Sequence, residues 1–124
     1  MTVKDIEKAE ERLRGVVHKI PVSTSHTFSE ITGAELYLKC ENQQKTGSFK
    51  VRGAYNMIAK LAETQKDIDT VIASSAGNHA QGVAYAASCL GMKSVIVMPK
   101  AAPMAKVSAT QGYGAEVVLH GDCY

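Results

Sequence analysis

The chain has 124 residues, 45% of them hydrophobic and 21% charged, which is the size and composition of a single soluble globular domain. Its formal net charge of +2, with charges of both signs mixed along the chain, gives no electrostatic reason to expect a nucleic-acid or membrane partner. Residues 1–11 are charged rather than apolar, and no apolar run is long enough for a signal peptide or a membrane-spanning helix.

In the first half of the chain, the sequence predicts two helices and one strand. Apolar residues at helical spacing predict a helix over 3–13. The hydroxyl-rich segment 21–29 has the composition of a loop, and alternation over 35–40 predicts a half-buried strand. The polar segment 41–48 then leads into a second stretch of helical spacing over 49–61.

The second half is more regular. Short β-branched runs over 69–73, 94–98 and 115–119 predict strands, connected by helices over 78–90 and 103–111. This alternation predicts an α/β fold with an open, mostly parallel sheet and flanking helices, and strands so continuously apolar predict cover on both faces. Because the chain stops where a further helix would begin, we expect a truncated chain with apolar sheet surface left uncovered.

The three cysteines give no sign of a structural bond or a metal site. Cys40, Cys89 and Cys123 are widely spaced and include no C-x-x-C pair. Disulfide frameworks and zinc sites use paired spacings, so we expect reduced cysteines in a cytoplasmic protein and no bound metal. Three histidines also lack the spacing of metal ligands: His18, His26 and His120.

Lys50 lies in the segment T-G-S-F-K-V-R-G, residues 46–53, just inside the second predicted helix. A lysine held in a desolvated cleft loses its proton more readily, and the neutral amine can form a Schiff base with a carbonyl compound. The alternative is an exposed helix lysine whose stem lies over apolar neighbours. The position of Lys50 leaves both interpretations open.

The segment S-S-A-G-N-H-A-Q-G, residues 74–82, follows a predicted strand and opens a predicted helix. Unpaired N–H groups and the positive end of the helix dipole suit a carboxylate or phosphate there, and small residues allow the backbone to approach it. An ordinary helix cap by a Ser or Asn side chain is equally compatible. The dinucleotide and P-loop signatures G-x-G-x-x-G and G-x-x-x-x-G-K-[ST] are absent from the sequence.

Together, K-T-G-S-F-K-x-R-G and S-A-G-N-H-A-Q-G resemble the fold-type II pyridoxal-phosphate enzymes, whose fold is that of the tryptophan synthase β subunit. Within that family the chain most resembles the threonine dehydratases (threonine ammonia-lyases), with serine dehydratase and serine racemase as close relatives. The resemblance extends to four further runs: residues 20–22, 38–42, 97–99 and 115–121.

The resemblance implies a division of the chain and an incomplete site. Residues 1–45 would form an amino-terminal helix and first strand, and residues 46–124 the βαβ part of the smaller domain of the catalytic region. The glycine-rich loop around the cofactor phosphate and the polar residue facing the pyridine nitrogen lie further along such chains. We therefore expect the rest of the enzyme to be absent here and these residues alone to be inactive.

The same resemblance implies roles for individual residues. Lys50 would bind pyridoxal 5′-phosphate covalently and move the substrate α-proton, Phe49 would pack against the cofactor ring, and Asn78 would donate to its phenolic oxygen. The substrate carboxylate would be held by five residues: Ser75, Ala76, Gly77, Asn78 and His79. L-Threonine would give 2-oxobutanoate and ammonia, as in isoleucine biosynthesis, and L-serine would give pyruvate and ammonia.

Alternatives and partners also follow from the resemblance. Serine racemase has an acid/base serine immediately before Gly-Asn-His, where this chain has Ala76, which cannot transfer a proton. For His79 we favour a backbone and packing role over that of a general base. A β-replacing relative and a non-catalytic α/β binding domain remain as further alternatives. Relatives are commonly homo-oligomers, and some bind a nucleotide effector, for which the candidate contacts are Thr24, Ser25, Lys45 and Thr46.

Overall fold

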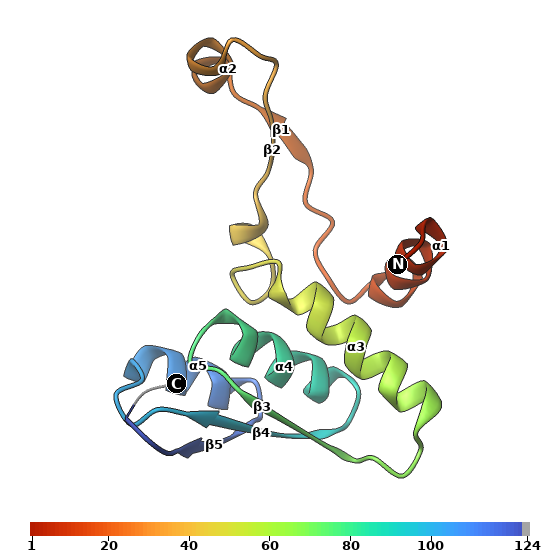
Figure 1. Ribbon diagram of the computed structural model, residues 1–124, viewed down its shortest axis with the longest axis vertical. Coiled ribbons are helices and arrows are strands. Elements are labelled where there is room, and N and C mark those ends of the chain that lie inside the picture. Colours follow the sequence, from red (N-terminus) through yellow and green to blue (C-terminus); the bar gives the residue numbers. More distant parts are fainter. Residues whose placement is uncertain (123–124) are drawn as a thin grey trace.

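The computed structural model describes residues 1–122, and Cys123 therefore lies outside the described residues. Its main body is a parallel sheet of order β3-β4-β5 with helices on one side (Figure 1). The predicted parallel α/β fold is confirmed, and most predicted ends are within one or two residues. The elements of this body are α3 (Lys50–Thr64), β3 (Thr70–Ser74), α4 (Asn78–Cys89), β4 (Lys93–Met98), α5 (Met104–Gly112) and β5 (Glu116–Leu119).

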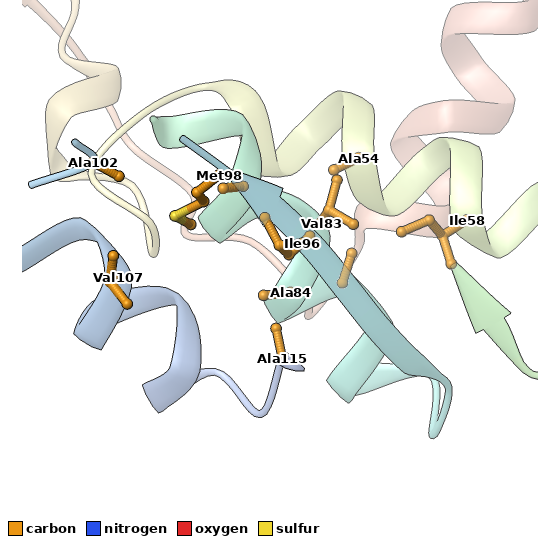
Figure 2. Close-up of a cluster of buried hydrophobic side chains, with 11 residues drawn as sticks. Ala54, Ile58, Val83, Ala84, Ile96, Met98, Ala102, Val107 and Ala115 are labelled. Carbon is orange, nitrogen blue, oxygen red and sulfur yellow. The ribbon is translucent and has the colours of Figure 1, made fainter. Parts of the chain in front are cut away.

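Helix α4 lies at the centre of the body because its side chains are small. Its sequence N-H-A-Q-G-V-A-Y-A-A-S-C buries seven of twelve residues, which lets α3 and the sheet pack close to it. Ile96 and Met98 of β4 are almost fully buried beneath α4, and Val107 fixes α5 on the same side of the sheet (Figure 2). Helix α4 is followed by a left-handed glycine, Gly91, with φ of 68°.

The opposite face of the sheet is open among the described residues. Ile72 is 74% exposed and Val118 38% exposed, while Val71, Ile96 and Val117 face the helices. The expected cover on both faces is therefore wrong for these residues, because the two connecting helices, α4 and α5, both pack on the side of Ile96. The expectation that apolar sheet surface is left uncovered is confirmed.

The amino-terminal part adds a helix and a hairpin. Helix α1 (Val3–Leu13), at its predicted limits, lies beside α3, where Arg12 Nε and Nη2 donate to the Glu63 carboxylate at 2.8 and 2.7 Å. Figure 1 shows the hairpin and the short helix between its strands standing away from the layered body. The elements of this part that follow α1 are β1 (Val22–Thr24), α2 (His26–Thr32), β2 (Tyr37–Lys39) and the 3₁₀ turn η1 (Glu41–Gln43).

The prediction of a loop over residues 21–29 is wrong. The hydroxyl-rich residues pair with β2 in register Val22↔Lys39 and then cap a helix, since Ser25 Oγ accepts from the N–H of Phe28 at 3.3 Å. The strand predicted over 35–40 is present over a shorter range as β2, and only Leu38 of it is partly buried. Among the described residues, no helix is long and apolar enough to cross a membrane.

Candidate active site

Lys50 is placed by a tight turn that precedes α3. Gly47, with φ of 67°, donates its N–H to the carbonyl of Gln44 at 2.7 Å, a conformation that favours glycine. Ser48 Oγ then accepts from the backbone N–H of Lys50 at 3.3 Å, and Lys50 is the first residue of α3. The turn therefore fixes the backbone of Lys50.

The side chain of Gln44 ties this turn to the segment after α1. It is almost fully buried; its Oε1 accepts from the N–H groups of His18 and Lys45 at 2.8 and 3.0 Å, and its Nε2 donates to the carbonyl of His18 at 3.0 Å. All the strong hydrogen-bonding directions of the amide oxygen and one of the nitrogen are used. No local pattern around Gln44 predicts this role, because its partner His18 is 26 positions away.

Two tyrosines hold Lys45 from α4 and from the end of α5. Lys45 Nζ donates to the hydroxyl of Tyr85 at 2.8 Å, and the Tyr113 hydroxyl donates to the carbonyl of Lys45 at 3.1 Å. The two rings meet edge to face with centroids 5.7 Å apart. The hydrogen bond to Tyr85 raises the pKa of Lys45, so this lysine stays protonated.

The side chain of Lys50 is exposed, with Nζ over the ring of Phe49 at 5.1 Å from its centroid. Phe49 is itself 58% exposed. The described residues thus present an amine beside an aromatic face at the surface of the body. The desolvated cleft considered from the sequence is not formed by these residues.

Gly82 brings the start of α4 to Lys50. A Cβ built on Gly82 would lie 3.2 Å from the carbonyl carbon of Lys50 and from the nitrogen of Val51, so the two helices touch through backbone at this point. Asn78 precedes Gly82 by one helical turn and lies on the same face of α4. The two chemistry-bearing segments predicted from the sequence are therefore neighbours in the structure.

The loop before α4 has no side-chain cap. The hydroxyl of Ser75 accepts from the N–H of Gly77 at 3.3 Å, and no side chain in the described part of the chain bonds the first turn of the helix. The side chain of Asn78 points to α5 instead, where its Oδ1 accepts from Lys106 Nζ at 3.1 Å. Of the two interpretations of this loop, the ordinary cap is wrong, and N–H groups at the positive end of α4 remain directed out of the helix.

Arg52 and Glu41 form an ion pair on the other side of Lys50. Arg52 Nε and Nη2 donate to the two carboxylate oxygens of Glu41 at 2.9 and 2.8 Å, and both side chains are largely covered. The hydrogen bonds from Arg52 lower the pKa of Glu41, and those to Glu41 raise the pKa of Arg52. The pair joins η1 to the first turn of α3. The arginine stands in the K-x-R-G motif, but the sequence did not predict its partner.

The four candidate nucleotide contacts do not form one group in this chain. Lys45 and Thr46 lie in the turn before α3, where the Thr46 hydroxyl is buried with no hydrogen-bond partner among residues 1–122. Thr24 and Ser25 lie at the end of β1 and the start of α2, in the part that stands away from the body (Figure 1). None of the described hydrogen bonds joins the two pairs.

The remaining sequence candidates lie apart from Lys50 or make other contacts. His18 Nδ1 is 3.3 Å from the carbonyl of Gln43, and His26 pairs with Glu30 at 3.4 Å on an exposed face of α2. His79 lies in the first turn of α4 and is exposed. Within residues 1–122, no three potential metal ligands gather, and Cys40 and Cys89 are free thiols.

The arrangement fits pyridoxal phosphate in the part of the site that these residues form. A primary amine stands beside an aromatic ring, and the start of α4 offers uncapped N–H groups to a carboxylate. A Cβ built on Gly77 would meet no atom within 4 Å, so there is open space beside this glycine of the loop. Lys50, Phe49 and Asn78 are the residues that would contact the cofactor.

Comparison with known proteins agrees with this chemistry. Residues 13–124 match the family model described as pyridoxal-phosphate dependent enzyme. The chain belongs to this family. Its members use pyridoxal phosphate as cofactor, and the structure of the chain is the corresponding part of a fold-type II pyridoxal-phosphate enzyme.

Relatives within the pyridoxal-phosphate family include both lyases and racemases. The chain is 51% identical over 124 residues to the L-threonine ammonia-lyase of Thermotoga maritima, covering 31% of that protein. It is 47% identical over 117 residues to the serine racemase of Dictyostelium discoideum, covering 94% of this chain and 36% of that protein. A crystal structure of a pyridoxal 5′-phosphate-dependent aspartate racemase superposes with a TM-score of 0.91 at 43% identity, covering 98% of this chain and 38% of the other. The chain thus spans about a third of the length of these relatives.

Proposed function

We propose that the protein to which these residues belong is a pyridoxal-phosphate-dependent dehydratase that converts L-threonine, and also L-serine, to a 2-oxo acid and ammonia by α,β-elimination. The observation that carries the proposal is the backbone contact between Lys50 and Gly82, which brings the first turn of α3 against α4 one helical turn after its uncapped start. The 51% identity with a threonine ammonia-lyase supports the same choice.

The proposal assigns a role to each site residue. Lys50 Nζ binds the cofactor and later moves the α-proton, and Phe49 packs against the ring. Asn78 donates to the phenolic oxygen. The substrate carboxylate accepts hydrogen bonds at the start of α4 from the loop of Ser75, Ala76, Gly77, Asn78 and His79. When bound, pyridoxal phosphate supplies the electron sink that makes loss of the α-proton feasible.

Ala76 favours elimination over racemisation. A racemase needs a second acid/base group on the substrate face opposite the lysine, and the methyl group of Ala76 cannot transfer a proton. Ala76 is partly buried between Ser75 and Gly77, next to the start of α4. We therefore propose that this protein shares its fold with the racemases and both its fold and its reaction with the ammonia-lyases. A β-replacing enzyme is a less suitable alternative because its loop usually has threonine around Gly-Asn.

Several further parts of the proposal concern the whole protein. Residues 1–45 and 46–124 contribute to different parts of the catalytic region, and residues beyond these complete the cofactor pocket. The exposed side chain of Lys50 supports the expectation that this chain alone is inactive or nearly so. The parent enzyme is a cytoplasmic homo-oligomer. A role in isoleucine biosynthesis belongs to the same proposal and depends on 2-oxobutanoate being the product.

A nucleotide effector is a separate part of the proposal. The buried, unpartnered hydroxyl of Thr46 next to the protonated Lys45 supports an anionic ligand at this turn. Thr24 and Ser25 lie in the hairpin part, which stands away from the body that holds Lys45 and Thr46. They would therefore reach the same ligand from a neighbouring subunit. The expected result is that ATP protects Lys45 from amine-directed labelling in the oligomeric parent protein, and that Thr46→Val removes the protection.

The proposal is tested first on the chain itself. We expect incubation with pyridoxal phosphate and reduction with borohydride to give one main adduct at Lys50, mapped by peptide mass spectrometry. Lys50→Ala should remove the adduct, whereas Lys60→Ala, at an exposed position on the same helix, should leave it unchanged. An equal yield in Lys50→Ala would contradict Lys50 as the reactive amine. Scattered labelling of many lysines would mean that these residues alone do not assemble the pocket, which leaves two options, an inactive part of the enzyme or a non-catalytic α/β domain, for a chimera with the missing residues to separate.

The reaction is tested by restoring the missing residues. The chain would be joined to the remaining part of the T. maritima ammonia-lyase, to which it is 51% identical, and assayed with L-threonine and L-serine. We expect formation of 2-oxobutanoate and pyruvate without D-serine, and loss of both activities in the Lys50→Ala chimera. D-Serine as the main product would favour a racemase, and β-replacement with added thiol would favour the third alternative.

A further inference from the structure

Lys106 occupies an electrostatically unfavourable position at the start of α5. It lies in the first turn of the helix, which contains no acidic residue, and the positive end of a helix dipole disfavours a cation there. Its neighbour Val107 is 5% exposed and packs in the core, which fixes the rotation of α5 and therefore the direction of Lys106. The stability of α5 does not explain a lysine at this position.

The ammonium of Lys106 decides which end of the Asn78 amide is held. Lys106 Nζ lies 3.1 Å from Asn78 Oδ1. An ammonium group has donors and no acceptor, so Asn78 must present its carbonyl oxygen to it. The NH₂ group is then the end of Asn78 that is left to donate elsewhere. The chemistry of the two groups alone requires this orientation of the amide.

We propose that Lys106 is a positioning residue that fixes the amide of Asn78 with its NH₂ group available to the phenolic oxygen of the cofactor. This inference rests on the proposed function and extends it to a residue of α5. An ionised phenolic oxygen accepts hydrogen bonds, so an amide turned the other way would place two acceptors together. Lys106 also adds its charge to the positive end of α4, beside the loop that takes the carboxylate.

The first experiment tests the contact without cofactor. The side-chain amide of Asn78 would be observed by ¹⁵N NMR in the wild-type chain and in Lys106→Arg, Lys106→Met and Lys106→Glu. Arginine is also a donor only, so its spectrum should resemble that of the wild type, whereas glutamate accepts and should turn the amide around. Lys93→Glu, with the same charge change at the amino end of β4, is the matched control. Identical Asn78 resonances in the wild type, Lys106→Met and Lys106→Glu would overturn the proposal.

The second experiment measures what the orientation does. Cofactor affinity and the absorption spectrum of the Lys50-bound cofactor would be compared among the same variants. We expect affinity to fall about threefold in Lys106→Met and about tenfold in Lys106→Glu, with a changed spectrum in both and rescue in Lys106→Arg. Lys93→Glu should match the wild type in affinity and spectrum.

The outcomes separate this inference from the proposed function. Absence of a Lys50 adduct in the wild-type chain, together with an inactive chimera, counts against the proposed function. An adduct that forms with equal affinity and spectrum in all Lys106 variants counts against the positioning role, even where the Asn78 resonances change. Urea unfolding of each variant identifies a general loss of structure. A cofactor spectrum that is the same in Lys106→Arg and Lys106→Met would count against the positioning role. A spectrum that is normal with a donor at position 106 and changed without one supports the proposal.

Discussion

Gly82 and Gly53 are both glycines inside helices, yet their surroundings differ. A Cβ on Gly82 would stand 3.2 Å from backbone atoms of Lys50 and Val51, whereas a Cβ on Gly53 would meet nothing within 4 Å. Replacing a helical glycine with alanine adds about 0.5–1 kcal/mol of stability where there is room. We expect Gly53→Ala to gain this amount and Gly82→Ala to gain none, because α3 must move away from α4.

A larger side chain at Gly82 gives a stronger test of the contact between α3 and α4. We expect Gly82→Val to lower the free energy of unfolding by about 1–3 kcal/mol, as overpacking does, and to reduce the yield of the Lys50 adduct. Urea denaturation followed by circular dichroism gives the first quantity, and peptide mapping gives the second. Equal stability of Gly82→Val and the wild type would mean that the backbone contact between α3 and α4 does not exist.

The ion pair of Glu41 and Arg52 predicts a dependence of stability on pH. Arg52 lowers the pKa of Glu41 in the folded chain. The ion pair therefore stabilises the folded chain at pH values above the ordinary carboxyl pKa, and this contribution is lost as the pH falls through the lowered pKa of Glu41. We expect Glu41→Gln to cost about 1 kcal/mol at neutral pH and nothing at a pH below the folded-state value. Glu7→Gln, on an exposed position of α1, serves as the control. If the difference in unfolding free energy between Glu41→Gln and the wild type is the same at all pH values, the charge interaction is contradicted.

At the scale of elements, the turn of residues 44–48 depends on one buried amide. Gln44→Ala would leave the N–H and the carbonyl of His18 without the partners that the side chain provides. We expect a loss of about 1–2 kcal/mol in the free energy of unfolding, measured by urea denaturation. Gln43→Ala, an exposed neighbour in η1, should change stability by less than about 0.5 kcal/mol. Equal effects of the two substitutions would show that the hydrogen bonds between the Gln44 side chain and His18 do not stabilise the chain.

Long elements were predicted well and short ones were not, for physical reasons. Helices α1 and α3 carry apolar residues at helical spacing over several turns, and α4 is rich in alanine over twelve residues, so the sequence of each predicts a helix at about the right place. Strand β1 and helix α2 have no buried residue, and their form depends on pairing with β2 and on the Ser25 cap, which composition does not reveal.

In the candidate site too, residues with a local sequence pattern were predicted and their partners from other elements were not. The motifs predicted Lys50 and the loop before α4 because each has a recognisable local pattern, and Gly82 stood in the second motif. The partners of these residues were not predictable: Lys106, Gln44 and Glu41 act across elements, and their roles exist only after α5, α3 and the segment around His18 have packed. Local pattern therefore predicts the candidate reactive residue, and tertiary contacts decide how that residue is held.

At the scale of the whole molecule, one face of the sheet is covered and the other carries apolar residues. Parallel pairing aligns Ile72, Val95 and Glu116 in one row, and Ser74, Val97 and Val118 in the next, on the side away from α4. Ile72 is 74% exposed and Val118 38% exposed. Apolar residues grouped on a parallel sheet are normally covered, so this face should bind apolar surfaces when the chain is studied alone.

We expect the chain to associate with rising concentration and to bind an apolar fluorescent dye through this face. Ile72→Glu should reduce both dye fluorescence and the mass measured by light scattering, with little effect on stability because the side chain is already exposed. The matched control is Ile31→Glu on α2, which is 73% exposed and makes the same chemical change away from the sheet. If Ile31→Glu reduces dye binding as much as Ile72→Glu does, the general hydrophobicity of the chain is responsible and the sheet face is not. If only Ile72→Glu acts, the open face of β3-β4-β5 is the surface by which this chain associates.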